Sequence, residues 1–113
     1  MIKIYKEKIS EKILRSFLGQ PYEELIKFVV DVRLFKIALG GELHADAEEL
    51  LLREGSKQAD LWGGNIYPDA AKEKKIRYTS MINLRPSQGQ RAMEIKDPRI
   101  QDQINRVLER ILP

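Results

Sequence analysis

Cysteine is absent from this 113-residue sequence. Its absence excludes disulfides, thiol catalysis, zinc–cysteine sites and iron–sulfur clusters, and it suits a reducing cytosol. The sequence also lacks the apolar core of a signal peptide and any apolar run that approaches the roughly 20 residues of a membrane span. We therefore expect a cytoplasmic protein without a membrane segment.

Histidine is scarce as well. Because His44 is the only one, every two-histidine metal site is excluded within one subunit. The glycine patterns of phosphate-binding loops and dinucleotide-binding turns are both missing, and no serine lies in the G-x-S-x-G turn of serine hydrolases. We consequently predict no cofactor, and no common catalytic motif names a reaction.

The residues that are present indicate a single globular domain over residues 1–113, with 42% hydrophobic and 33% charged residues. The net charge of +3 is unevenly spread. Residues 37–70 carry 2 basic and 7 acidic side chains, whereas residues 71–113 carry 10 basic and 5 acidic ones. This pattern indicates either attraction between the two segments or an anion-binding surface on the basic one.

Hydrophobic periodicity predicts several strands and two terminal helices. The N-terminal helix follows Ser10 and ends before Gly19, and the C-terminal helix is capped by Asp97 and begins at Pro98. Alternating residues predict strands at 2–5, 28–39, 61–67, 75–85 and, briefly, 92–95. The short connections favour an α+β fold, with about four to five mostly antiparallel strands in a meander, packed by an N-terminal and a C-terminal amphipathic helix.

The segment after Gly40 and Gly41 has two interpretations. The glycine pair predicts a hairpin, and residues 42–49 would then form a strand that places Glu48 opposite Arg33. The same residues also resemble a helix from Asp46 to Arg53, because they contain a capping-box pattern and strong helix formers. We favour the strand and keep the helix as the alternative.

On a strand, His44, Asp46 and Glu48 would share one face. Such a row can bind a divalent metal, or it can use the histidine as an acid or base oriented by a carboxylate. These three residues are the candidate catalytic set. The structural alternative is a charged sheet face in which Glu48 pairs with Arg33.

The basic part of the chain supplies the candidate anion-binding set. One face of the expected strand at 75–85 and the loop after it carry arginine forks and amides, which suit phosphate or carboxylate. The candidate ligand-binding residues are Arg33, Arg77, Asn83, Arg85, Gln88 and Arg91. The structural alternative is a solvated face whose arginines pair with the acidic middle segment. Nucleic acid stays open as a partner but is disfavoured, because no recognisable binding motif is present.

Three stretches are distinctive as a set: GGELHADAEELL at 40–51, GSKQADLWGGNIYP at 55–68 and SMINLRPSQGQRAMEIKDPRI at 80–100. Together they resemble a family of small prokaryotic proteins known only as a domain of unknown function. The resemblance covers most of the chain after Phe28 and implies a free-standing cytosolic protein of one domain. It carries no reaction, ligand or catalytic residue over to this sequence.

Three hypotheses about function follow. The first is a non-enzymatic binding or interaction domain that takes an anionic small molecule or protein partner on its basic face. The second is a small enzyme that uses His44 with Asp46 or Glu48, with or without a metal. The third is a subunit of a homo-oligomer or complex, in which a partner covers the exposed edge of the short sheet.

Overall fold

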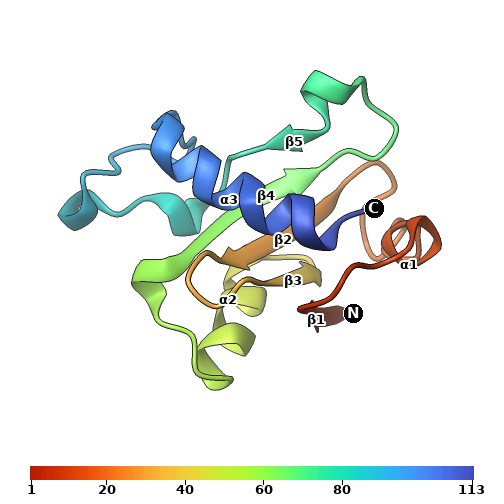
Figure 1. The fold of residues 1–113 in the computed structure, drawn as a ribbon, viewed down its shortest axis with the longest axis horizontal. Coiled ribbons are helices and arrows are strands. Elements are labelled where there is room, and N and C mark those ends of the chain that lie inside the picture. Colours follow the sequence, from red (N-terminus) through yellow and green to blue (C-terminus); the bar gives the residue numbers. More distant parts are fainter.

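A computed structural model describes residues 1–113 and contains one five-stranded antiparallel sheet with helices on both faces (Figure 1). The strands are β1 (Ile2–Tyr5), β2 (Ile26–Asp31), β3 (Lys36–Gly40), β4 (Leu61–Ile66) and β5 (Ile76–Arg77). The α-helices are α1 (Glu11–Arg15), α2 (His44–Arg53) and α3 (Pro98–Ile111). The expected α+β fold is confirmed. The strand order is β1-β3-β2-β4-β5, so that β1 pairs with β3 and not with its neighbour in sequence.

Four short 3-10 helices complete the fold, and they are η1 (Gln58–Asp60), η2 (Lys72–Lys74), η3 (Met81–Asn83) and η4 (Pro86–Gln88). None of the helices combines the length and the apolar composition needed to span a lipid bilayer. The strand expected at 61–67 and both caps of the terminal helices are confirmed: Ser10 accepts from the Ile13 N–H, and Asp97 accepts from the Arg99 N–H.

The single strand expected at 28–39 is wrong, because the chain turns between β2 and β3. The Asp31 carboxylate causes this break. Its Oδ1 accepts from the backbone N–H groups of Arg33 and Leu34 at 2.9 and 2.8 Å, and its Oδ2 accepts from the Ser56 hydroxyl at 2.6 Å. A buried aspartate that accepts from the backbone amides two and three residues later stabilises a local turn, which alternation of apolar residues does not reveal.

The strand expected at 42–49 is also wrong, and the helix alternative is right. Helix α2 begins at His44, two residues before the expected cap, and Gly40 and Gly41 lead into it instead of forming a hairpin. It buries Ala47 and Leu51 against the sheet. An antiparallel sheet of this size has a second face to cover, and α2 covers it.

The strand expected at 75–85 is correct only for Ile76 and Arg77. Beyond them the chain leaves the sheet and forms η3, which Ser80 caps by accepting from the Ile82 N–H. The brief strand expected at 92–95 is reduced to one bridge between Thr79 and Glu94. The basic strand face proposed from the sequence is therefore not present as a strand.

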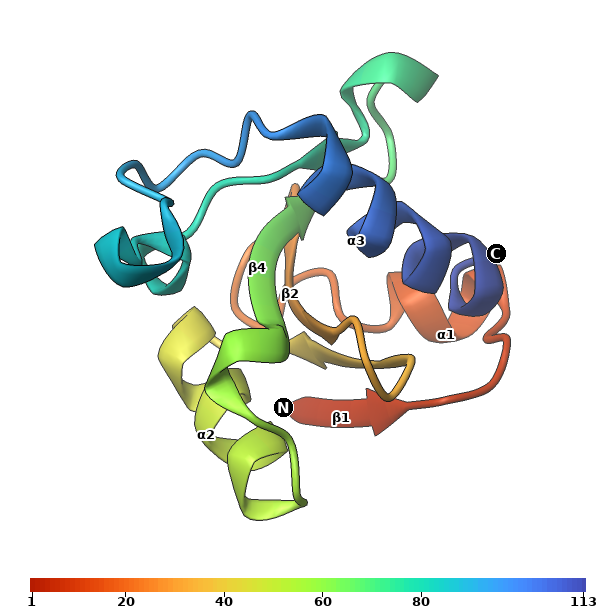
Figure 2. The same ribbon diagram turned by 60° about the vertical axis from the view of Figure 1, so that its left-hand side comes forward.

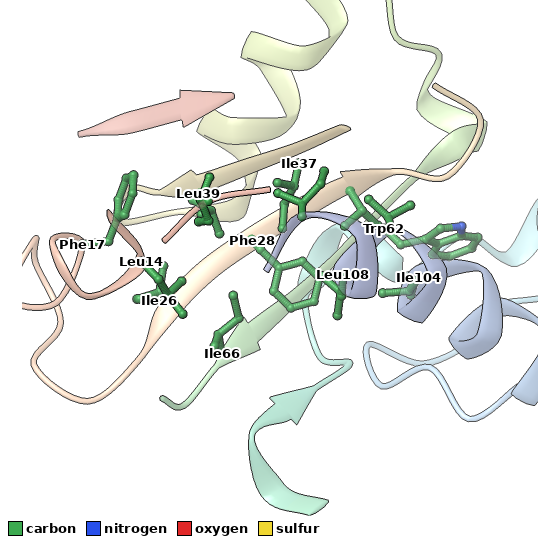
Figure 3. Packing of buried hydrophobic residues seen from close by; sticks show 14 of the residues in the cluster. Leu14, Phe17, Ile26, Phe28, Ile37, Leu39, Trp62, Ile66, Ile104 and Leu108 are labelled. Carbon is green, nitrogen blue, oxygen red and sulfur yellow. The ribbon is translucent and has the colours of Figure 1, made fainter. Parts of the chain in front are cut away.

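Two separate cores hold the layers together. Helices α1 and α3 lie on one face of the sheet, and α2 lies on the other (Figure 2). The larger core packs Phe28 and Ile37 of the sheet against Ile104 and Leu108 of α3 (Figure 3). Trp62 belongs to this core, so that its ring is not available to stack on a nucleic-acid base.

Candidate functional site

The candidate catalytic set from the sequence lies on helix α2, and its members do not converge. Asp46 is exposed in the first turn of α2. Glu48 lies one turn after His44 but interacts with Arg85 and Gln58. Burial raises the pKa of the Glu48 carboxyl, and the charge of Arg85 opposes that shift. No group of three histidine, aspartate or glutamate side chains is arranged to hold a metal ion.

Two members of the candidate anion-binding set are internal. The Asn83 side chain accepts from the Gly63 N–H at 2.8 Å and donates to the Gly63 carbonyl at 2.9 Å. Arg85 lies with its guanidinium 3.9 Å from the centroid of the Trp62 ring. Its N–H groups donate to the carbonyls of Gln58, Leu61 and Ile82. The hydrogen-bonding groups of both side chains are therefore bonded to the backbone of this protein and not free for a ligand.

The other members of that set lie at the surface. Arg33 forms an ion pair with Asp60 at 2.9 Å and not with Glu48. Arg77 lies over the Tyr67 ring, and Gln88 accepts from Arg85 at 3.3 Å. Arg91 is exposed. Since the buried and exposed members have different partners, the set does not form one anion-binding face.

A different site lies where the start of α2 meets the sheet. A pocket of about 440 Å³ opens there between β2, β4, the N-terminal turn of α2 and the chain leading into η3. We refer to it as the Lys27 pocket. Its lining residues are Lys27, Leu43, His44, Ala45, Asn65, Thr79, Ser80, Met81 and Ile82.

The sheet register places two of these residues side by side, because Lys27 of β2 is the cross-strand partner of Asn65 of β4. Gly64 allows a further part of the lining, the chain after β5, to approach β4. A Cβ atom at Gly64 would lie 2.4 Å from the backbone oxygen of Arg77 and 2.5 Å from the Phe28 ring. The chain after β5 therefore passes close to β4, and it brings Thr79 and Ser80 to the pocket.

Lys27 supplies the only charged side chain of the pocket. It is partly buried, and its ammonium lies 5.3 Å from the centroid of the Tyr22 ring. Burial lowers the pKa of Lys27, and no carboxylate or hydrogen-bond acceptor opposes the shift. A partly desolvated positive charge without a counter-ion favours an anion in the pocket.

His44 borders Lys27 and is only 9% exposed. Its Nε2 lies 2.7 Å from the Gly64 carbonyl, which only accepts, so that Nε2 carries the hydrogen. Burial lowers the pKa of His44, and the charge of Lys27 lowers it further, against the hydrogen bond to Gly64 and the nearby Asn65 side chain. The imidazole is therefore neutral at pH 7, and Nδ1 is a hydrogen-bond acceptor.

Asn65 adds an unpaired polar atom. Its Oδ1 is shielded from solvent and has no hydrogen-bond partner of ordinary geometry, although its side chain lies close enough to His44 to influence the imidazole. Buried amide atoms are nearly always paired with protein or water. Oδ1 is thus a buried acceptor beside His44, and the part of the Asn65 amide that can donate to a ligand is Nδ2.

Among the polar residues of this pocket, His44 is a candidate from the sequence, whereas Lys27 and Asn65 are not. A local signal for Lys27 exists, because it interrupts the apolar run from Ile26 to Val30. No comparable signal marks Asn65, since only the pairing of β2 with β4 places it beside Lys27.

Two other pockets of similar volume are less suited to a ligand. One lies near the end of α3 and includes Glu11 and Glu109, and its Lys8 already donates to the carbonyls of Glu109 and Leu112. In the other, Asp60 and Asp97 are already paired with arginines. The Lys27 pocket differs from both because its lining contains no carboxylate to compete with a bound anion.

A comparison of the sequence with known protein families assigns the chain to a family. A protein family described as "Protein of unknown function (DUF5674)" matches residues 3–111, and the chain belongs to it. This membership confirms the resemblance to a domain of unknown function. No curated protein and no solved structure matches the chain.

Proposed function

We propose that this protein is a binding domain and that the Lys27 pocket receives a small organic anion. The observation that carries the proposal is Lys27, which lines a pocket of about 440 Å³, is partly buried and has no ion-pair partner. Ligand pockets commonly span about 300–1,000 Å³ and combine apolar walls with a few polar groups. An anion beside Lys27 would supply the missing counter-charge, and low solvent exposure strengthens that attraction.

Two further features support an anion there, and His44 adds a contact for another part of the ligand. His44 is neutral and offers Nδ1 as an acceptor, so that it can orient a ligand N–H or O–H group. The Asn65 side chain lines the same pocket, and its Nδ2 group can donate to an anion. The first turn of α2 faces the same pocket, and its N-cap residue Leu43 makes no side-chain cap, so that the positive end of the helix dipole adds to the charge of Lys27.

The anionic partner is the one expected from the sequence, but its site is the Lys27 pocket and not the loop that contains Arg85 and Arg91. The enzyme hypothesis has less support, because neither Asp46 nor Glu48 orients the His44 imidazole. The cytosolic location expected from the sequence stays a prediction.

Binding of a small anion tests the proposal directly. Isothermal titration with benzoate and phenyl phosphate should detect binding to the wild type and loss of that binding in Lys27→Met. This variant keeps an unbranched apolar stem of similar length and removes the charge. Lys96→Met is the matched control, because Lys96 is exposed and does not line the pocket.

Thermal denaturation separates loss of binding from loss of fold. Lys27→Met should be at least as stable as the wild type, because it removes a charge whose burial has a free-energy cost. Equal binding by Lys27→Met and the wild type, or no binding of either anion by the wild type, would overturn the proposal.

A further inference from the structure

We infer that the ligand of the Lys27 pocket is an amphipathic monocarboxylate, with its carboxylate at Lys27 and its apolar body across Leu43 and Met81. This inference rests on the proposed function and makes it more specific.

The single positive charge of the pocket favours a ligand with one negative charge. Lys27 is the only charged side chain in the lining, and the neighbouring His44 is neutral at pH 7. A carboxylate therefore gives a neutral complex. A phosphate monoester, with close to two negative charges at neutral pH, would leave about one charge without a partner in a partly buried site.

The hydrogen-bonding groups favour the same acid. No arginine lines the pocket, and arginine is the side chain whose fork best matches the oxygens of phosphate. The side-chain donors open to a ligand are Lys27, the Asn65 amide and the hydroxyls of Thr79 and Ser80. The oxygen of Ser80 also accepts from the Ile82 N–H, which fixes the position of its hydroxyl. This small set suits two carboxylate oxygens better than the several oxygens of a phosphate group.

The walls of the pocket favour an apolar body. Leu43, Ala45, Met81 and Ile82 all line it. Leu43 and Met81 are 58% and 78% exposed, which is unusual for such large apolar side chains and leaves apolar surface uncovered around the charged group. Methionine is unbranched and adapts to differently shaped partners. A ligand that covered both side chains would remove this surface from water.

A matched series of ligands distinguishes these features. Phenylacetate has the carboxylate and the aromatic body, benzyl alcohol lacks the charge, benzyl phosphate has about one more negative charge, and acetate lacks the body. At pH 7.5 the wild type should bind phenylacetate roughly tenfold more tightly than each of the other three, as expected for one added favourable contact. NMR or calorimetric titrations give the four affinities.

Two variants assign the preference to the pocket. Lys27→Met should lose the preference for phenylacetate over benzyl alcohol and still bind the alcohol. Met81→Ser should weaken phenylacetate several-fold without changing acetate. Leu84→Ser is the control for Met81→Ser, because Leu84 is also exposed and does not line the pocket.

Three other results of these titrations would overturn the inference. If benzyl phosphate binds as tightly as phenylacetate or more tightly, the inference is wrong and the proposed anion site stands. If benzyl alcohol or acetate matches phenylacetate, the charge or the apolar body has no role and the inference is also wrong. If none of the anions binds, both the inference and the proposed function fail.

Discussion

The side chain of Asn83 makes with Gly63 the two hydrogen bonds that a neighbouring strand would otherwise make. Its Oδ1 accepts from the Gly63 N–H, its Nδ2 donates to the Gly63 carbonyl, and Nδ2 also donates to the carbonyl of Met93 at 3.1 Å. Strand β5 ends at Arg77, so that the edge of β4 is completed by a side chain instead of a backbone. This contact explains how the chain leaves the sheet without exposing unpaired groups at Gly63.

Replacing Asn83 by alanine should therefore destabilise the fold strongly. The Gly63 N–H and carbonyl would stay buried without partners, at a cost on the order of 3 kcal/mol in the free energy of unfolding. Urea denaturation followed by circular dichroism measures the change. Gln103→Ala, at an exposed position of α3, is the control. A loss below about 1 kcal/mol in Asn83→Ala would show that water replaces the amide.

Arg85 should prove structural and not ligand-binding. Arg85→Lys keeps the charge but loses the planar guanidinium over Trp62 and most of the donors to backbone carbonyls. We expect a loss of about 2 kcal/mol in the free energy of unfolding, whereas Arg91→Lys should change it by less than about 0.5 kcal/mol. Chemical denaturation of both variants tests this contrast. Equal stabilities would return Arg85 to the candidate ligand-binding residues.

His44 should make the stability depend on pH. Its pKa in the folded chain is lowered from the usual 6.5 by burial and by the charge of Lys27. As the pH falls below 6.5, the unfolded chain binds a proton that the folded chain does not, so the free energy of unfolding decreases until the folded pKa is reached. His44→Gln cannot titrate and should lack this part of the decrease. Denaturation midpoints at pH 7.5 and 5.5 for both proteins give the comparison, and parallel profiles would contradict it.

Gly64→Ala should cost more than Gly89→Ala. The new methyl group at Gly64 would meet the Arg77 carbonyl and the Phe28 ring, and we expect a loss of about 2–3 kcal/mol from overpacking. Gly89 has φ +81° and open space around it, so that only backbone strain of about 1 kcal/mol is expected. Thermal denaturation ranks the two variants. If Gly64→Ala were the milder change, the close approach of the chain after β5 would be in doubt.

Elements with complete local signals were predicted from the sequence alone. Asp97, Pro98 and an apolar stripe specify α3 because a cap, a fixed φ angle and helical spacing all lie within the same segment. The glycine-containing strand β4 was likewise expected, with Pro68 close after its end. The turn at Asp31 was missed because its carboxylate interrupts the strand through hydrogen bonds that alternation does not encode.

The identity of α2 depended on the rest of the molecule. Its residues suit a strand or a helix locally, and the apolar face formed by Val29, Ala38 and Leu61 favours the helix by burying Ala47 and Leu51. The candidate site also depends on the tertiary structure. The sequence by itself indicated His44 and contains a charged lysine within the apolar run of β2. Only the tertiary structure placed Lys27 beside Asn65 and His44, because strand pairing and helix packing join residues whose separation in sequence has no local signature.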